Sequence, residues 1–190
     1  ISACLVGSEM CIRDRPEQRT RLTDEEVIAR CPWATTGRTH HRTPNIITSL
    51  ELDPAEMEKR NIHLQKKYAE IEENEVRFEE LHCEDAEYLI VAFGSCARIA
   101  QKAMEMAREE GIKVGLLRPI TLWPFPSKAI AARAAQVKGI LTVELNAGQM
   151  VEDVRLAVEC KVPVEHFGRL GGIVPDPDEV ITALKEKLIK

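Results

Sequence analysis

The sequence lacks the features of two large classes of protein. It has no excess of positive charge, because 26 Lys and Arg residues stand against 31 Asp and Glu residues and the net charge is -5. A nucleic-acid-binding domain normally carries a basic patch or stripe. No apolar run approaches the roughly 18 residues that a membrane-spanning helix needs. We therefore expect neither nucleic acid nor a membrane among its partners.

Closely spaced cysteines are also missing. The six cysteines are widely separated and none forms a Cys-x-x-Cys pair, the spacing that is frequent in zinc sites and iron–sulfur clusters. The histidines show no ligand spacing either, so the sequence predicts no metal site. The Gly-x-Gly-x-x-Gly fingerprint of dinucleotide-binding proteins is absent as well. Scattered thiols in a chain of ordinary composition indicate a reducing compartment, and we expect a cytoplasmic protein.

Residues 1–15 differ from the rest of the chain. Residues 4–15 read CLVGSEMCIRDR, and the chain begins with Ile1. The string resembles a translated sequencing adaptor, so we interpret residues 1–15 as a non-native segment at the start of a truncated reading frame. A secretory signal is the alternative, but the apolar stretch Ala3–Val6 is too short for one.

Residues 16–85 are interpreted as a linker plus one long helix. Turn-forming residues dominate the linker, although a short helix is expected to open at Thr23. Asp53 and Pro54 are typical of a helix N-terminus, and apolar residues recur at helical spacing to about residue 74. The acidic stretch Glu70–Glu87 is interpreted as a solvated connector, with an acidic docking site as the less favoured alternative. A long irregular segment is unusual in a compact domain, so we expect it to lie against a missing partner domain.

From residue 86 to residue 190 the pattern alternates between strands and helices. The predicted strands are Tyr88–Phe93, Val114–Leu117, Gly139–Glu144 and Val162–Phe167. The predicted helices cover about 94–110, 127–136 and 149–160, with a last one opening at Asp176 and Pro177. Such alternation is typical of an α/β fold with a mostly parallel open sheet and helices on both faces.

Two loops that follow predicted strands contain the candidate binding residues. Sheets of this kind bind ligands at the carboxyl ends of their strands, where helix N-termini present backbone N–H groups. The weak candidates for cofactor binding are Gly94, Ser95, Cys96, Asn146, Gly148 and Gln149.

A purely structural interpretation of the same loops stays open. In it Gly94 permits a tight turn, Ser95 caps the helix, and Asn146 serves the turn chemistry of its loop. Cys96 is either a thiol activated at a helix start or a small buried residue. No catalytic residue is assigned.

Several motifs together resemble one family. They are Cys31–Gly37, Asn45–Leu50, Ala92–Arg98, Leu117–Pro126, Glu144–Val151 and Gly168–Gly172. They look like the alpha subunit of 2-oxoacid:ferredoxin oxidoreductases, most of all the branched-chain type (2-oxoisovalerate, or 3-methyl-2-oxobutanoate) and next the 2-oxoglutarate type. The resemblance covers about Leu22 to Leu188.

The resemblance implies that residues 86–190 form a domain like the C-terminal domain of transketolase. It implies that an N-terminal pyrimidine-binding domain is missing, so the chain is a C-terminal fragment with a structural, subunit-docking role and no activity alone. The implied reaction of the intact complex converts a 2-oxoacid, coenzyme A and oxidised ferredoxin into an acyl-CoA, carbon dioxide and reduced ferredoxin.

The resemblance also implies cofactors and partners. Thiamine diphosphate and magnesium would belong to the intact complex, and iron–sulfur clusters to partner subunits. Neither would be bound by this fragment alone, and the sequence contains no Gly-Asp-Gly motif for diphosphate and magnesium. The implied partners are the beta, gamma and delta subunits, with ferredoxin and coenzyme A meeting the complex. The substrate is not fixed by this part of the chain.

Two alternatives share the predicted fold. One is the C-terminal domain of another thiamine enzyme, a transketolase or a pyruvate dehydrogenase beta subunit, and the segment 32–37 argues against it. The other is a non-enzymatic α/β binding module of the receiver or flavodoxin kind. A receiver needs a phospho-acceptor Asp at a strand end, whereas the strand that begins at Tyr88 ends in Phe93-Gly94.

Overall fold

The computed structural model describes residues 22–31, 33 and 48–189. The segment 1–15, interpreted above as non-native, and most of the motif Cys31–Gly37 lie outside these residues. The chain divides into two compact units, and the described parts of residues 16–67 belong to one and residues 68–189 to the other. The long helix crosses the boundary between them.

The first unit contains the N-terminal helices. They are α2 (Asp24–Arg30) and the larger part of α3 (Pro54–Asn74). Both begin where the sequence predicts. Thr23 and Glu26 form a capping box, with the Thr23 N–H donating to the Glu26 carboxylate at 2.8 Å, and Asp53 accepts a hydrogen bond from the second residue of α3 at 2.8 Å. No residue of either helix is buried.

The second unit is built on a five-stranded sheet. Its strands are β1 (Phe78–Leu81), β2 (Tyr88–Ala92), β3 (Val114–Pro119), β4 (Gly139–Glu144) and β5 (Val164–Gly168). They lie in the order β1-β3-β2-β4-β5, with β1 antiparallel to β3 and every other pair parallel. The predicted fold class, α/β with a mostly parallel open sheet, is confirmed.

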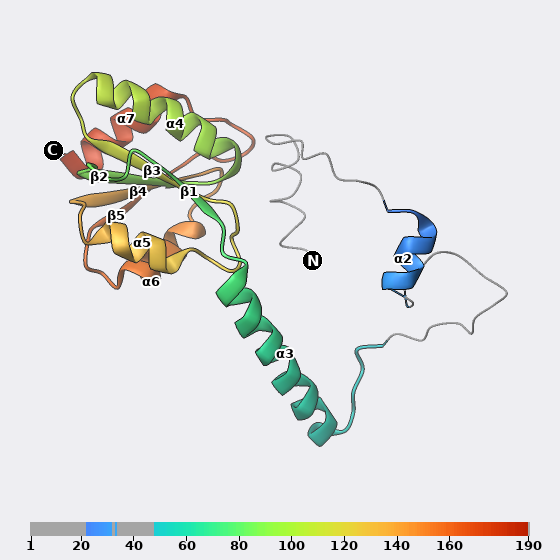
Figure 1. The fold of residues 1–190 in the computed structure, drawn as a ribbon. Helices are drawn as coiled ribbons and strands as arrows, with labels where there is room; N and C mark the ends of the chain where they lie inside the picture. The colour runs from blue at the N-terminus through green and yellow to red at the C-terminus, as the bar shows by residue number, and fades with distance from the viewer. Residues whose placement is uncertain (1–21, 32, 34–47, 190) are drawn as a thin grey trace. The chain divides into compact units, whose positions relative to one another are not determined.

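Helices cover both faces of this sheet, as Figure 1 shows. They are α4 (Gly94–Glu109), α5 (Ser127–Ala134), α6 (Met150–Val158) and α7 (Pro177–Leu184), which continues into the π-helical segment η1 (Lys185–Ile189). Helices α4 and α7 pack on one face, and α5 and α6 on the other (Figure 1). Helix α7 begins after Asp176, as the sequence predicts, and Asp176 and Glu179 form a capping box there. None of the described helices is both long and apolar enough to cross a membrane.

The two apolar cores follow from the period-two alternation of a strand. Ile90 and Ala92 of β2 enter the core beneath α4 and α7. Leu89 and Val91 of the same strand enter the core beneath α5 and α6. Strand β2 is therefore buried on both sides, which explains why its sequence reads as a continuous apolar run.

The strand β1 is not predicted by the sequence. It lies inside the acidic stretch Glu70–Glu87, and the interpretation of that stretch as a solvated connector is wrong for residues 78–81. Two cations neutralise the strand. Glu79 pairs with Arg118 directly across on β3 at 3.2 Å, and Glu80 accepts two hydrogen bonds from Arg133 of α5 at 2.9 and 2.6 Å. The acidic composition of this stretch cannot reveal that Arg118 and Arg133 neutralise it, because both arginines lie far away in the sequence.

Candidate functional site

The two candidate loops meet where the direction of the chain across the sheet reverses. After β2 the chain moves to β3 on one side, and after β4 it moves to β5 on the other. The carboxyl ends of β2 and β4 are neighbours, with Ala92 paired to Val143. Open α/β sheets bind ligands at such a switch point. The structure thus brings Gly94–Cys96 and Asn146–Gln149 to one place.

The first loop is a tight turn into α4. Gly94 has φ 57, a left-handed conformation that glycine adopts without strain. The N-cap of α4 is Phe93, which offers no side-chain hydrogen bond, so the interpretation of Ser95 as the cap is wrong. Ser95 is exposed in the first turn. Cys96 is buried, and that burial, together with the negative charge of Glu144, raises the pKa of its thiol to about 11. Cys96 is therefore an inert core residue rather than an activated thiol.

The second loop is organised by a buried carboxylate. Glu144 ends β4 and has no exposed surface. Its Oε2 accepts hydrogen bonds from the backbone N–H groups of Gln149 at 3.2 Å and Met150 at 2.8 Å. Its Oε1 accepts one from Val151 at 3.0 Å. These N–H groups at the start of α6 have no acceptor within the helix. The Glu144 side chain therefore joins the end of β4 to the N-terminus of α6 and places a negative charge there.

A histidine on the neighbouring strand completes this network. His166 of β5 lies opposite Thr142 of β4. Its Nδ1 lies 3.4 Å from Glu144 Oε1 and 3.2 Å from Thr142 Oγ1. The Thr142 hydroxyl donates to the Glu165 carbonyl at 3.3 Å. The side chains of Glu144 and His166 therefore join the ends of two strands to the N-terminus of α6.

The remaining candidate residues serve the turn or face solvent. Asn146 Oδ1 accepts a hydrogen bond from the Gly148 N–H at 2.7 Å, which is the turn chemistry that its sequence predicts. Gly148 has φ 112, which favours glycine. Gln149 is exposed and makes no cap with its side chain. Ser95 and Gln149 are thus the candidate side chains at the switch point that face solvent.

Close packing beneath this loop makes Gly168 sensitive to substitution. A Cβ atom there would overlap the Asn146 carbonyl oxygen and come within 2.6 Å of His166 Nε2. We expect Gly168→Ala to lower the free energy of unfolding by about 2–3 kcal/mol, as overpacking does. Urea unfolding followed by circular dichroism measures it. Gly171→Ala is the control, because its Cβ meets nothing within 4 Å and only the positive φ of 65 costs stability, about 1 kcal/mol. Equal losses in the two variants would contradict the packing argument.

Sequence reasoning missed the two residues that hold this site together. Glu144 lies inside one of the family motifs but is not among the candidates, and the spacing of the histidines gives no reason to single out His166. One signal was present: Glu144 is a carboxylate at the last position of a strand whose other residues suit a core. A charge in that position needs partners, because an uncompensated buried charge is costly.

Exposed apolar side chains follow three strands at the same edge of the sheet. They are Leu122 and Trp123 after β3, Leu145 after β4, and Leu170, Ile173 and Val174 after β5, and we call them the carboxyl-edge residues. Parallel strands end at one edge, so these loops share it. Leu170, Ile173 and Val174 are each 56–58% exposed. Such a concentration of exposed apolar groups is typical of a surface that binds other protein.

Hydrogen bonds hold the loop after β3 in a fixed conformation. The Thr121 hydroxyl donates to the Pro124 carbonyl at 2.9 Å, and its oxygen accepts from the Arg77 N–H at 3.0 Å. The Trp123 ring packs edge-on against Tyr68 at the end of α3, with ring centroids 5.7 Å apart. These contacts hold the exposed Trp123 side chain in one orientation.

An ion pair fixes the loop after β5. Arg169, just after the strand, pairs with Glu179 in the first turn of α7. Glu179 Oε2 also accepts a hydrogen bond from the Asp176 N–H at 3.2 Å. The loop that carries Leu170 and Ile173 is thus tied at both of its ends.

The described residues do not fit the metal groups that the resemblance implies. Glu144 already accepts three backbone hydrogen bonds, and the described part of the chain holds no group of three His, Cys, Asp or Glu residues arranged for a metal ion. Cys83 and Cys96 belong to the cores on opposite faces of the sheet, so they cannot share one iron–sulfur cluster. Burial raises the pKa of the Cys83 thiol to about 11, as it does for Cys96.

Comparison with known proteins identifies relatives of this arrangement. Residues 86–180 match the family model for the pyruvate:ferredoxin oxidoreductase core domain II. The chain is 46% identical over 165 residues to the ketoisovalerate oxidoreductase subunit VorB of Methanothermobacter thermautotrophicus, covering 85% of this chain and 46% of that protein. It is 32% identical over 143 residues to the 2-oxoglutarate synthase subunit KorA of Archaeoglobus fulgidus, covering 74% of this chain and 40% of that protein. The chain thus spans about half the length of these relatives.

Solved structures extend the comparison. The 2-oxoglutarate:ferredoxin oxidoreductase of Magnetococcus marinus, solved with 2-oxoglutarate, coenzyme A and succinyl-CoA bound, is 26% identical with a TM-score of 0.62. It covers 72% of this chain and 24% of its own chain. A split-gene transketolase in an inactive beta4 tetramer has a TM-score of 0.50 at 20% identity, over 60% of this chain and 42% of its own. The second likeness is one of fold alone and confirms the predicted transketolase-like architecture.

Proposed function

The chain belongs to the pyruvate:ferredoxin oxidoreductase core domain II family, and from that premise we propose that it forms the C-terminal part of the alpha subunit of a 2-oxoacid:ferredoxin oxidoreductase. The observation that carries the proposal is the 46% identity to a ketoisovalerate oxidoreductase subunit over 85% of this chain. The same similarity favours a branched-chain 2-oxoacid as the substrate of the intact complex.

Within that complex we propose a docking role for this chain. The carboxyl-edge residues expose apolar surface on loops that hydrogen bonds and an ion pair hold in place. Helices α2 and α3 bury none of their own residues, and Leu50 and Leu52 between them are 70% and 82% exposed. Apolar groups so exposed gain free energy when another protein surface covers them. In this proposal the exposed segment Leu50–Leu52 and the helices α2 and α3 lie against a further domain or subunit.

In this proposal the reaction is carried out by the intact complex and not by this chain alone. The complex converts a 2-oxoacid, coenzyme A and oxidised ferredoxin into an acyl-CoA, carbon dioxide and reduced ferredoxin. In this proposal thiamine diphosphate and magnesium belong to the intact complex, and the iron–sulfur clusters belong to partner subunits. The loops Gly94–Cys96 and Asn146–Gln149 contribute the rim of the shared site, with Ser95 and Gln149 facing outward.

A chimeric subunit tests this proposal. Residues 22–189 would replace the matching part of VorB from Methanothermobacter thermautotrophicus, and the chimera would be co-produced with the other subunits of that enzyme. We expect the complex to assemble and to reduce ferredoxin with 2-oxoisovalerate and coenzyme A, at a rate within about tenfold of the parent (1.4 kcal/mol). The VorB subunit without this part is the control and should be inactive. A folded chimera that neither assembles nor turns over the oxoacid would refute the assignment.

A further inference from the structure

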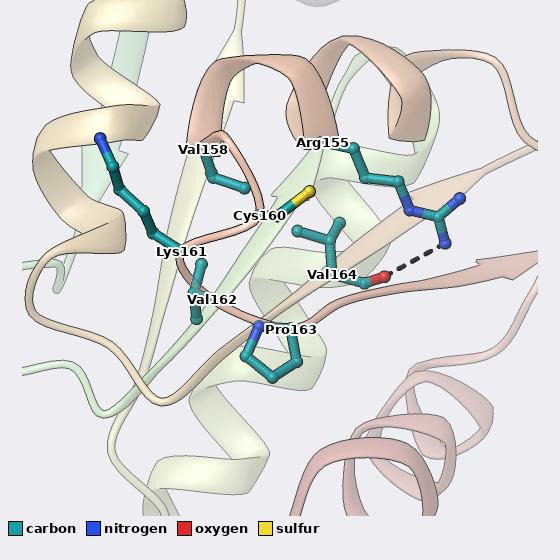
Figure 2. A pocket seen from close by; sticks show the side chains of 7 residues that line it. All are labelled: Arg155, Val158, Cys160, Lys161, Val162, Pro163 and Val164. Carbon is teal, nitrogen blue, oxygen red and sulfur yellow. Dashed lines mark hydrogen bonds between the residues drawn. The ribbon is translucent and has the colours of Figure 1, made fainter.

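A pocket of about 360 Å³ lies where α6 ends and β5 begins. It is lined by Arg155, Val158, Cys160, Lys161, Val162, Pro163 and Val164 (Figure 2). Because β5 runs from Val164 towards Gly168, this pocket lies at the amino end of the strand. The carboxyl-edge residues and the loops around Glu144 lie at the other end. The pocket is therefore separate from the proposed docking surface.

A turn with unusual backbone conformation shapes the pocket. Helix α6 ends at Val158, and the next two residues, Glu159 and Cys160, have φ values of 51 and 59. Left-handed conformations are costly for residues other than glycine. The Lys161 N–H donates to the Val158 carbonyl at 2.9 Å and closes the turn. This turn carries Cys160 and Lys161 to the edge of the pocket.

The floor of the pocket is apolar and belongs to the protein core. Val158, Val162 and Val164 are all 9% exposed or less and join the core beneath α5 and α6, so they form the floor of the pocket. Cys160 and Pro163 are exposed and offer the accessible apolar surface. An aliphatic chain that covers such an apolar surface removes it from water, which favours binding of that chain.

The charges around the pocket are unequally compensated. Lys161 Nζ pairs with Glu159 at 2.8 Å. Arg155 donates to the Val164 carbonyl at 3.2 Å, and among the described residues it pairs with no carboxylate. Figure 2 shows the Arg155 and Lys161 side chains extending to opposite sides, with the Cys160 sulfur between them. Arg155 therefore leaves one positive charge, with further N–H donors, beside an apolar pocket.

We propose that this pocket binds a short-chain aliphatic carboxylate. The aliphatic chain lies against the exposed Pro163 ring over a floor that includes Val162, and the carboxylate accepts hydrogen bonds from the Arg155 guanidinium. The combination of an apolar wall and an uncompensated cation selects this class of ligand over a neutral or cationic one, because a charge-assisted hydrogen bond to Arg is roughly twice as strong as a neutral one. The proposal does not rest on the oxidoreductase assignment.

Cys160 provides the readout for a direct test. Its thiol is exposed and free, so a ligand in the pocket should shield it from iodoacetamide. The full chain would be alkylated in the presence of acetate, butanoate, hexanoate or uncharged hexanamide, and modification of each cysteine followed by peptide mass spectrometry. We expect protection of Cys160 to strengthen with chain length, by up to about fourfold per buried methylene. Hexanamide should protect about tenfold less well than hexanoate, and alkylation of Cys31 should not change.

Variants of Arg155 identify the cation. Arg155→Gln should raise the hexanoate concentration for half protection by about tenfold, and Arg155→Lys by about threefold or less, since lysine keeps the charge. Lys102→Gln on α4 is the matched control for lost charge and should behave as the wild type. Thermal unfolding of each variant checks that the fold is intact. Equal protection by hexanoate and hexanamide, equal slowing at Cys31 and Cys160, or no effect of Arg155→Gln would each overturn the proposal.

Discussion

Replacing Glu144 with glutamine is expected to lower the free energy of unfolding by about 3 kcal/mol. The glutamine side chain has the same size, but its NH2 group must face backbone N–H donors on one side of the old carboxylate. Either Val151 or the pair Gln149 and Met150 then loses its acceptor. The negative charge beside the N-terminus of α6 is lost as well. Thermal unfolding followed by circular dichroism should show the midpoint falling by about 10 °C.

Glu152→Gln is the matched control for Glu144→Gln. Glu152 lies in the first turn of the same helix but is exposed. Removing its charge costs only the weak attraction of a surface carboxylate to the helix N-terminus, about 0.5 kcal/mol. A midpoint for Glu144→Gln equal to that of Glu152→Gln would mean that the buried hydrogen bonds do not stabilise this domain.

The second large effect is expected on assembly rather than on folding. Replacing Leu170 and Ile173 together with serine should weaken association of the chain with its partner subunits by at least about tenfold. Both side chains are more than half exposed in this structure, so the isolated fold should lose less than about 0.5 kcal/mol. Covering each in an interface is worth about 1 kcal/mol or more. Subunits purified separately and titrated by analytical ultracentrifugation would give the affinity.

Leu156→Ser tests whether the effect depends on position. Leu156 is 78% exposed on α6 and does not belong to the carboxyl-edge residues. We expect this variant to assemble as the wild type does. Loss of assembly in all variants alike would indicate a general effect of removing surface leucines, and unchanged assembly of the Leu170 and Ile173 variant would refute docking through the carboxyl edge.

Much of the fold can be predicted from local sequence patterns. The apolar run of β2, the capping residues Thr23, Asp53 and Asp176, and the alternation of strands with helices were all interpreted correctly, because each depends on residues close together in the chain. The family resemblance could also be recognised from the sequence, since its motifs lie at the ends of those elements. The positions of the two candidate loops after strands could be predicted for the same reason.

Contacts between residues that are distant in the chain could not be predicted from the sequence. The acidic strand β1 joins the sheet because Arg118 and Arg133 neutralise it from 39 and 53 residues away. Ser95 does not cap α4, because the helix begins at Gly94, two residues earlier than a cap at Ser95 would require.

The sequence by itself determined the α/β class, the family and the positions of the two loops at strand ends. Only the tertiary structure decided which contacts the residues of those loops make. It placed the Glu144 carboxylate against the start of α6 and within reach of His166, gathered the carboxyl-edge residues on one side, and opened the pocket beside Arg155. The physical reason is that hydrogen bonds and apolar contacts act over a few ångströms in space, and only folding decides which distant residues come that close.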